Sequence, residues 1–243
     1  MQSTQKLAIF NVFALLIVLF INYLSNSLPL NGQTAGDISD RLNVLFTPAG
    51  YVFSIWGIIY FLLIVWMIGQ FVSINASNVI QTVGPWFIIS CLFNVSWLFA
   101  FHFEYFSTSL LVMILLLFSL IVIYRKLQKQ TTPRAWQIPF SVYLGWVSVA
   151  TIVNVGVVFA SYGLEFFGTS SIITTIILIF LATSLAVWFT ISKKDIIYPL
   201  VFIWAFIGIA VERVDYTSIF YTAWAMVIVL SAFVLTQFAR WIK

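Results

Sequence analysis

Charged residues are scarce in this chain, and their scarcity excludes most classes of protein. The 243 residues include 11 Lys and Arg and 7 Asp and Glu, which make up 7% of the chain, against about 25% in soluble domains. Hydrophobic residues make up 63%, and the mean hydropathy is +1.09. Such a chain cannot cover a globule with polar side chains, so a soluble enzyme is excluded. Disorder is excluded too, because it requires low hydrophobicity and high charge. An integral membrane protein is the class that remains.

Cysteine and histidine are nearly absent as well. Cys91 is the one cysteine and His102 the one histidine, which excludes a disulfide framework, a thiolate cluster and a multi-histidine metal site. His102 is expected to be an interfacial histidine bonded to Glu104 or water, with a catalytic or haem-ligand role as the alternative. No nucleophile elbow, Walker loop or dinucleotide fingerprint occurs. We therefore expect no enzyme, no catalytic residues, no metal and no resident cofactor.

The apolar residues gather into long segments that contain no charge. A membrane-spanning helix needs about 20 mostly apolar residues, and continuous apolar runs of this length favour helices over the alternating strands of a barrel. Four of the six prolines lie at or near the predicted helix starts, where the missing N–H costs nothing. The sequence predicts an all-α integral membrane protein with eight transmembrane helices: Leu7–Leu24, Ala49–Val72, Val83–Phe101, Phe106–Tyr124, Ile138–Ala160, Ser170–Ile191, Ile196–Val211 and Ser218–Phe238.

The charges between these segments predict which way the chain faces. With eight crossings both termini lie on one side, together with nine of the eleven basic residues, from Lys6 to Lys243. The opposite side holds Arg41 and Arg213 and six of the seven acidic residues, Glu165 among them. Basic loops stay in the cytoplasm, so we expect a multi-pass protein of the cell membrane with both termini cytoplasmic. If the short segment Ile196–Val211 did not cross, this asymmetry would weaken.

Three of the segments carry aromatic or amide side chains at helical spacing. The second has Phe53, Trp56 and Tyr60, the third has Asn94 and Trp97, and the fifth has Tyr143, Trp146, Ala150 and Asn154. Each set lies on one helix face. An asparagine in hydrocarbon needs a polar partner, so Asn94 and Asn154 should face the protein interior.

The depth of these residues allows two interpretations. At a rise of about 1.5 Å per residue, most of them lie roughly 5–15 Å below the outer boundary of the membrane. They could line one cavity in the outer half, with tryptophans for stacking and amides for orientation. They could equally be packing residues that hold the helices together. Spacing by itself does not decide between a ligand pocket and packing.

The same residues resemble the translocator protein/tryptophan-rich sensory protein (TspO/MBR) family. Its second helix begins with a Pro-Pro-x-Trp-Val-Phe-Gly-Pro-Val-Trp-x-x-Leu-Tyr pattern, which Pro48, Val52, Phe53, Trp56 and Tyr60 match with one residue missing. Its third helix has Leu-Asn-x-x-Trp, matched by Asn94 and Trp97. The fifth has Tyr-x-x-Trp-Val-Ser-x-Ala-x-x-x-Asn, matched from Tyr143 to Asn154. The Trp-Tyr pair of the family's first loop is absent from Asn31–Phe46.

The resemblance implies a fold and a function. It predicts a TspO-like five-helix core over residues 1–160 and a three-helix C-terminal membrane extension over residues 161–243. It also implies that the nine residues above bind a flat hydrophobic ligand, such as a tetrapyrrole or a sterol, in a sensory or ligand-transfer role. Because the outer face is acidic and disfavours a dicarboxylic porphyrin arriving from outside, we expect either a neutral or cationic flat ligand or entry of the ligand from the lipid.

Two other functions stay open at this point. One is a transporter of a small neutral solute or lipid, and the other is a structural subunit of a membrane complex. The expected partners are a hydrophobic small molecule and the lipid bilayer, without nucleic acid, and a homodimer stays open.

Overall fold

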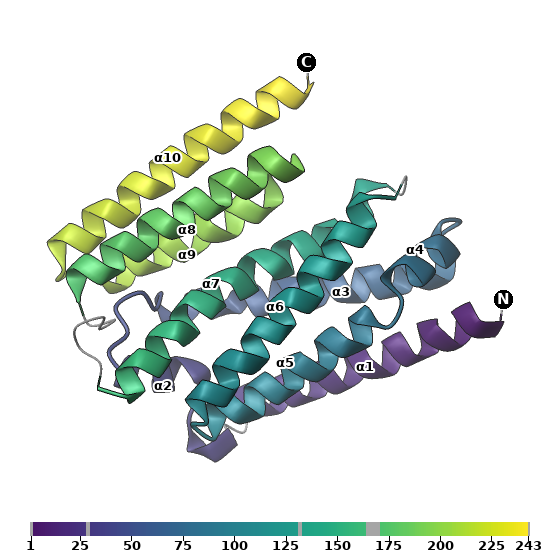
Figure 1. Ribbon diagram of the computed structural model, residues 1–243, viewed down its shortest axis with the longest axis horizontal. Coiled ribbons are helices and arrows are strands. Elements are labelled where there is room, and N and C mark those ends of the chain that lie inside the picture. Colours follow the sequence, from purple (N-terminus) through teal and green to yellow (C-terminus); the bar gives the residue numbers. More distant parts are fainter. Residues whose placement is uncertain (1, 28–29, 131–132, 164–170, 243) are drawn as a thin grey trace. The chain divides into compact units, whose positions relative to one another are not determined.

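The computed structural model describes residues 2–27, 30–130, 133–163 and 171–242, and every regular element in them is a helix (Figure 1). Three residues used in the sequence analysis, Glu165, Ser170 and Lys243, lie outside the described residues. The chain forms two compact units. The first contains Met1–Ala35 and Ile55–Val147, and the second contains Gly36–Ser54 and Ser148–Lys243. The predicted division at residue 160 stays a prediction.

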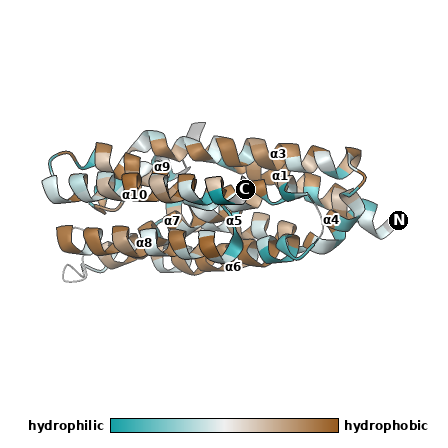
Figure 2. Ribbon diagram, turned by 90° about the horizontal axis from the view of Figure 1, so that it is seen from above, coloured by the Kyte–Doolittle hydropathy of each residue, from teal (hydrophilic) through white to brown (hydrophobic). Residues whose placement is uncertain are grey.

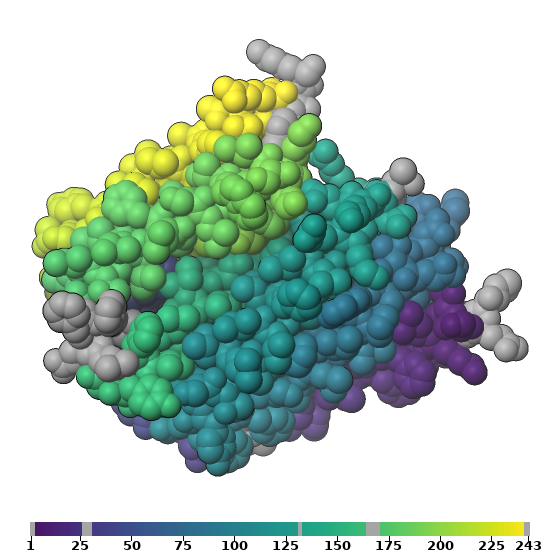
Figure 3. All heavy atoms as spheres, viewed as in Figure 1, coloured from purple at the N-terminus to yellow at the C-terminus, as the bar shows by residue number. Residues whose placement is uncertain are grey.

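The first unit is a bundle built from five long helices. Its elements are α1 (Gln2–Ser27), η1 (Leu30–Gly32), α3 (Ile55–Val72), α4 (Ala76–Val83), α5 (Trp86–His102), α6 (Phe106–Gln128), η3 (Arg134–Trp136) and the first part of α7 (Ile138–Ser161). Helix α5 packs against both α1 and α6. On the face seen in Figure 3, side chains of α5 and α6 form a continuous surface. The helices are held by apolar packing, with buried leucines and phenylalanines along α6 and α5.

A break separates α4 from α5, where the sequence predicted one segment from Val83 to Phe101. Gly84 adopts φ +59°, a conformation that suits glycine, and Pro85 follows at the N-terminal end of α5. Proline cannot continue a helix from the preceding turn because it lacks the N–H and its ring clashes. The axes of α4 and α5 therefore differ by 57°. The buried side of α4 packs through Ala76 and Ile80 on Ala8 of α1.

The second unit groups the three C-terminal helices. It contains α2 (Ala35–Arg41), η2 (Gly50–Ser54), the end of α7, α8 (Ile172–Lys193), α9 (Ile197–Glu212) and α10 (Thr217–Ile242). Helices α8, α9 and α10 lie side by side (Figure 1). Asp195 ends the turn between α8 and α9, and its carboxylate accepts hydrogen bonds from the backbone N–H groups of Ile197 and Tyr198 at 2.8 and 3.2 Å. The carboxylate of Asp195, which precedes the N-cap residue Ile196, thus satisfies the first backbone N–H groups of α9.

The segment before α3 packs directly on α9. The backbone N–H of Ala49 donates to the carbonyl of Gly208 at 3.2 Å, and the indole of Trp204 donates to the carbonyl of Val52 at 3.1 Å. A β-carbon at Gly208 would overlap side-chain atoms of Val52 and Pro48. Glycine is therefore required at position 208 for this close approach.

All eight apolar segments form helices, and most of them can cross a membrane. Six helices are long and apolar enough to span, and the bent pair α4 and α5 makes a seventh if it counts as one span. Helix α9 is apolar but shorter, with 16 residues. Figure 2 shows hydrophobic residues along most of the helices. Exactly eight spans are therefore not established by length and composition; the structure supports six or seven.

Candidate functional site

Four aromatic side chains of the first unit surround one tryptophan, Trp56. Trp56, in the first turn of α3, stacks on Tyr60 with ring centroids 5.6 Å apart and on Trp97 of α5 at 6.3 Å. Tyr143 and Trp146 of α7 meet the same indole edge-to-face at 5.8 and 6.3 Å. We call Trp56, Tyr60, Trp97, Tyr143 and Trp146 the Trp56 cluster. The structure thus brings together residues that the sequence placed on three separate helices.

A chain of hydrogen bonds through the side-chain amides of Asn22 and Asn94, here called the amide chain, ends on Tyr143 of the Trp56 cluster. Asn94 of α5 is fully buried. Its side chain accepts a hydrogen bond from Nδ2 of Asn22 and donates one to the hydroxyl of Tyr143, both at 2.9 Å. Asn22 also donates to the carbonyl of Val18, one turn earlier in α1, at 2.9 Å. The chain therefore joins α1, α5 and α7, as expected for an amide that must find partners inside a membrane.

One donor of the cluster has no such partner. The indole Nε1 of Trp97 is buried and has no hydrogen-bond partner among the described residues. A buried donor without an acceptor costs about 1–3 kcal/mol. The indole that carries it stacks on Trp56. The cluster therefore combines stacked apolar rings with a buried donor that lacks an acceptor.

Three of the nine predicted site residues belong to the second unit. Phe53 lies in η2, before α3 begins at Ile55. Its position is therefore not set by the helical spacing that relates Trp56 to Tyr60. Ala150 and Asn154 lie on the later turns of α7, and Asn154 is buried. Their part in a ligand site stays a prediction from the family resemblance.

The site has little acid–base chemistry to offer. No group of three or more His, Cys, Asp or Glu that could hold a metal occurs in the described part of the chain. His102 lies at the end of α5, and its Nδ1 donates to the carbonyl of Leu98 at 2.8 Å. Because a carbonyl can only accept, this hydrogen bond requires the tautomer with Nδ1 protonated. The bond gives His102 a structural role at the end of α5.

Several polar residues of the first unit were missed by the sequence analysis. Asn22 and Asn11 occupy the first apolar segment, and Gln70 occupies the second, yet none was nominated. Asn11 donates to Gln70 at 3.2 Å, joining α1 to α3. The signal was available, because an amide in an apolar segment needs a polar partner wherever it occurs.

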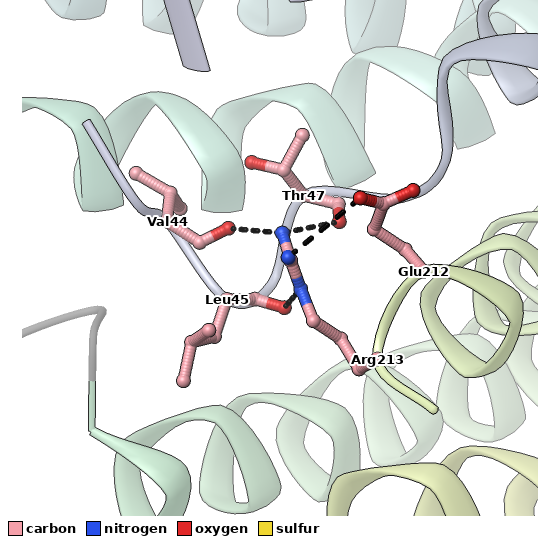
Figure 4. A network of polar contacts seen from close by, with 5 residues as sticks. All are labelled: Val44, Leu45, Thr47, Glu212 and Arg213. Carbon is pink, nitrogen blue, oxygen red and sulfur yellow. Dashed lines mark hydrogen bonds and ion pairs between the residues drawn. The ribbon is translucent and has the colours of Figure 1, made fainter. Parts of the chain in front are cut away.

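Arg213 is one of two basic residues predicted on the outer face. Its side chain hydrogen-bonds to the backbone of a loop in the second unit (Figure 4). Its guanidinium donates to the carbonyls of Leu45, Val44 and Thr47 at 3.1, 3.3 and 3.4 Å, and it lies 3.8 Å from a carboxylate oxygen of Glu212. Burial raises the pKa of Asp40, and the positive charge of Arg213 offsets part of that rise. Arg213 therefore holds the segment that precedes α3.

Comparison with known proteins supports the family that the motifs suggested. The chain matches the family described as TSPO-like protein over residues 8–236, which includes the helices after α7. No curated protein and no solved structure matches the chain. Because the family match covers nearly the whole sequence, this membrane protein belongs to the TSPO-like family, as the patterns around Trp56, Asn94 and Trp146 predicted.

Proposed function

We propose that the protein crosses the cell membrane eight times with both termini in the cytoplasm. Nine of the eleven basic residues fall on the cytoplasmic side in this arrangement, as the positive-inside rule requires. Helix α9, at 16 residues, would be about 24 Å long and would make the eighth crossing. Cysteine accessibility at introduced sites on the α8–α9 and α9–α10 turns would test this, and labelling of both turns from one side would contradict it.

We further propose that the Trp56 cluster binds a flat hydrophobic ligand, in a sensory or ligand-transfer role. The observation that carries this proposal is the buried indole donor Trp97 Nε1, which has no hydrogen-bond partner among the described residues. A cluster that serves only for packing gains no stability from such an atom. A ligand that places an acceptor against it recovers part of the roughly 1–3 kcal/mol that a buried donor without an acceptor costs.

The surroundings of the cluster define the class of ligand. Trp56 and its neighbours offer ring faces that favour a flat apolar molecule. The nearby amide chain is neutral, and no charged residue occurs in α3 or in the turns of α5 and α7 that carry the cluster. A bare carboxylate would therefore be desolvated without a counter-ion. We propose a neutral tetrapyrrole- or sterol-like molecule that carries a hydrogen-bond acceptor, and binding instead of catalysis.

A matched pair of porphyrins tests the proposal. Protoporphyrin IX and its dimethyl ester have the same ring, but the ester replaces two carboxylates by neutral carbonyl acceptors. Quenching of the intrinsic tryptophan fluorescence, measured on protein in detergent, should saturate with the ester and be weaker with the diacid. Trp97→Phe removes the N–H and keeps an aromatic ring, and we expect it to weaken binding of the ester about threefold to tenfold.

Trp86→Phe is the matched control for this measurement. Trp86 also lies on α5, but it packs edge-to-face on Phe118 of α6 and takes no part in the cluster. Its substitution should leave the affinity for the ester unchanged. Unsaturable quenching by the ester, or equal affinities of the Trp97→Phe and Trp86→Phe variants, would contradict the proposed site. Tighter binding of the diacid would contradict the proposed neutrality of the ligand.

A further inference from the structure

Basic side chains gather at one end of the first unit, away from the Trp56 cluster. Arg125 and Lys126 lie in the last turn of α6, and Lys129 is its C-cap. All three are exposed. Each residue turns an α-helix by about 100°, so positions 125, 126 and 129 fall within an arc of about 100°. The three positive charges therefore lie on one exposed side of α6.

A contact between η3 and α6 brings a fourth basic residue to this end. The side chain of Gln137, between η3 and α7, donates to the carbonyl of Leu127 in the last turn of α6 at 3.3 Å. The backbone N–H of Gln137 donates to the carbonyl of Arg134 at 2.9 Å. Arg134 thus lies within one turn of this contact, and its side chain is exposed.

Helix α4 connects a fifth basic residue to the group. Nζ of Lys126 donates to the carbonyl of Thr82, in the last turn of α4, at 3.1 Å. The preceding residue, Gln81, donates to the hydroxyl of Thr4 in α1 at 3.0 Å, and the exposed Lys6 follows Thr4 by two positions. Ends of α1, α4 and α6 therefore meet here. We call the five residues the basic end: Lys6, Arg125, Lys126, Lys129 and Arg134.

No carboxylate of the first unit neutralises the basic end. The single acidic residue in the sequence ranges of this unit is Glu104, which lies in the turn between α5 and α6. Roughly 30 Å of α6 separate that turn from Arg125, too far for an ion pair. The basic end therefore presents its positive charges to anions from outside the unit.

The ammonium of Lys126 is held in a position that suits an anion. A lysine ammonium has three N–H donors, and the bond to Thr82 uses one of them. The other two can donate to phosphate oxygens. The same bond restrains a long flexible side chain, so less conformational entropy is lost when an anion binds.

Exposed apolar side chains at the same end favour a lipid over a soluble anion. Ile74, in the turn between α3 and α4, is fully exposed, and Phe71 and Val72 at the end of α3 are exposed as well. Helix α4 packs against α1, α3 and α6, so this apolar turn lies at the end of the bundle that carries the charges. A phospholipid matches both features, because it joins a charged headgroup to acyl chains.

The length of α6 places the basic end at the level of the headgroups. Phe106–Gln128 is one of the helices long and apolar enough to cross a membrane. Its 23 residues extend about 34 Å, slightly more than the hydrocarbon core of about 30 Å. Clusters of roughly four to eight Lys and Arg directly beside a spanning helix are typical of sites for anionic lipids.

We infer that the basic end binds the headgroup of an anionic phospholipid. The ammonium and guanidinium groups contact the headgroup phosphate, and Ile74 and Phe71 lie against the acyl chains. This surface goes beyond the proposed function, which concerns the Trp56 cluster. A role of the basic residues in membrane orientation alone would give the purified protein no preference between lipids.

Native mass spectrometry of the full-length protein in detergent tests this lipid preference. The protein is titrated with phosphatidylglycerol or with phosphatidylcholine of the same acyl chains. Both lipids contain a phosphate, but phosphatidylcholine has no net charge. We expect saturable binding of phosphatidylglycerol, at least about tenfold tighter than binding of phosphatidylcholine. Equal affinities for the two lipids would overturn the inference.

The triple variant Arg125→Gln, Lys126→Gln, Lys129→Gln removes the part of the basic end that lies on α6. Its affinity for phosphatidylglycerol should fall at least about tenfold. The double variant Lys126→Arg, Lys129→Arg keeps the charges and should bind as the wild type does. Orientation in the membrane does not affect these measurements, because they are made in detergent. The comparison of the two lipids on the wild type needs no variant and decides the matter even if the triple variant does not fold.

A charge-matched control distinguishes a site from attraction by net charge. Lys193→Gln, Lys194→Gln, Arg240→Gln removes three basic residues from the second unit, where Asp195 directly follows Lys194. We expect its affinity for phosphatidylglycerol to change less than about twofold. Equal losses in the two triple variants would overturn a site at the basic end.

Glycerol phosphate distinguishes a lipid headgroup from a free phosphate. It carries the charged group of phosphatidylglycerol without the acyl chains. We expect it to displace phosphatidylglycerol only at a large molar excess, and displacement at equal concentrations would overturn the assignment to a lipid. Quenching of tryptophan fluorescence by the porphyrin ester should be the same in the wild type and the basic-end variant, so failure of the Trp56 site and failure of the basic end are distinguishable.

Discussion

Replacing Asn94 by leucine tests whether the amide chain joins the helices of the first unit. The substitution keeps a side chain of similar size at a fully buried position and removes two hydrogen bonds, from Asn22 and to Tyr143, each 2.9 Å long. Asn22 keeps its bond to the carbonyl of Val18, so its amide is not left without a partner. The hydroxyl of Tyr143 loses the hydrogen bond that Asn94 donates to it.

The expected loss of stability follows from the two hydrogen bonds that the substitution removes. Hydrogen bonds between transmembrane helices contribute about 0.6 kcal/mol on average, with a maximum near 1.7 kcal/mol. Two of them give about 1.2 kcal/mol, which corresponds to a fall in the melting temperature of roughly 2–5 °C for a chain of this length. Tyr143→Phe removes one bond and keeps the ring that packs on Trp56, so it should cost about 0.6 kcal/mol.

A double-mutant cycle measures the bond itself. Unfolding of the wild type, both single variants and the double variant in mixed micelles should give a coupling energy of about 0.6 kcal/mol between Asn94 and Tyr143. Asn78→Leu, at an exposed position of α4, controls for the removal of an amide as such and should leave the free energy of unfolding nearly unchanged. Strict additivity of the two single variants would refute the reasoning.

Three further predictions concern the second unit. Arg213→Met deprives three backbone carbonyls of a hydrogen-bond donor. At about 1 kcal/mol for each bond, we expect the free energy of unfolding, measured by thermal unfolding, to fall by about 3 kcal/mol. The control Arg240→Met, at an exposed position, should have little effect. Gly208→Ala forces a β-carbon into Val52 and should cost about 1–3 kcal/mol, so a melting temperature equal to that of the wild type would contradict the close packing. Burial raises the pKa of Asp40 above its usual 3.8. Between that value and the raised pKa, the folded state holds a proton that the unfolded state has released. The free energy of unfolding therefore falls as pH rises through this range. Asp40→Asn should therefore become more stable relative to the wild type as pH rises above 3.8, and a difference in melting temperature that does not change with pH would contradict this.

The helices could be predicted from the sequence because charge and hydropathy determine them directly. The sequence predicted the weakest segment as Ile196–Val211, and the structure has α9 at Ile197–Glu212. The third segment was partly wrong at its start, because hydropathy does not register the turn that Gly84 and Pro85 impose before α5. Backbone conformation at such a break depends on a few residues that a hydropathy average hides.

The candidate site could be predicted in part. Helical spacing placed Trp56, Trp97 and Trp146 on faces that the structure brings together. The partners of the amides could not be derived, because the pairing of Asn94 with Asn22 depends on which helices are neighbours. Spacing along one helix says nothing about its neighbours, whereas the pattern of a known family does. The family resemblance therefore predicted that the three helices share a site, but it did not predict that Asn22 is the partner of Asn94.

The short length of α9 has a consequence for the surrounding lipid. Its 16 residues extend about 24 Å, roughly 6 Å less than an average hydrocarbon core. Hydrophobic mismatch of this kind costs fractions of a kcal/mol per Å and is relieved when the bilayer thins locally. If α9 crosses, lipids with shorter acyl chains should collect beside the C-terminal helices, and the protein should partition into thinner regions of a mixed membrane.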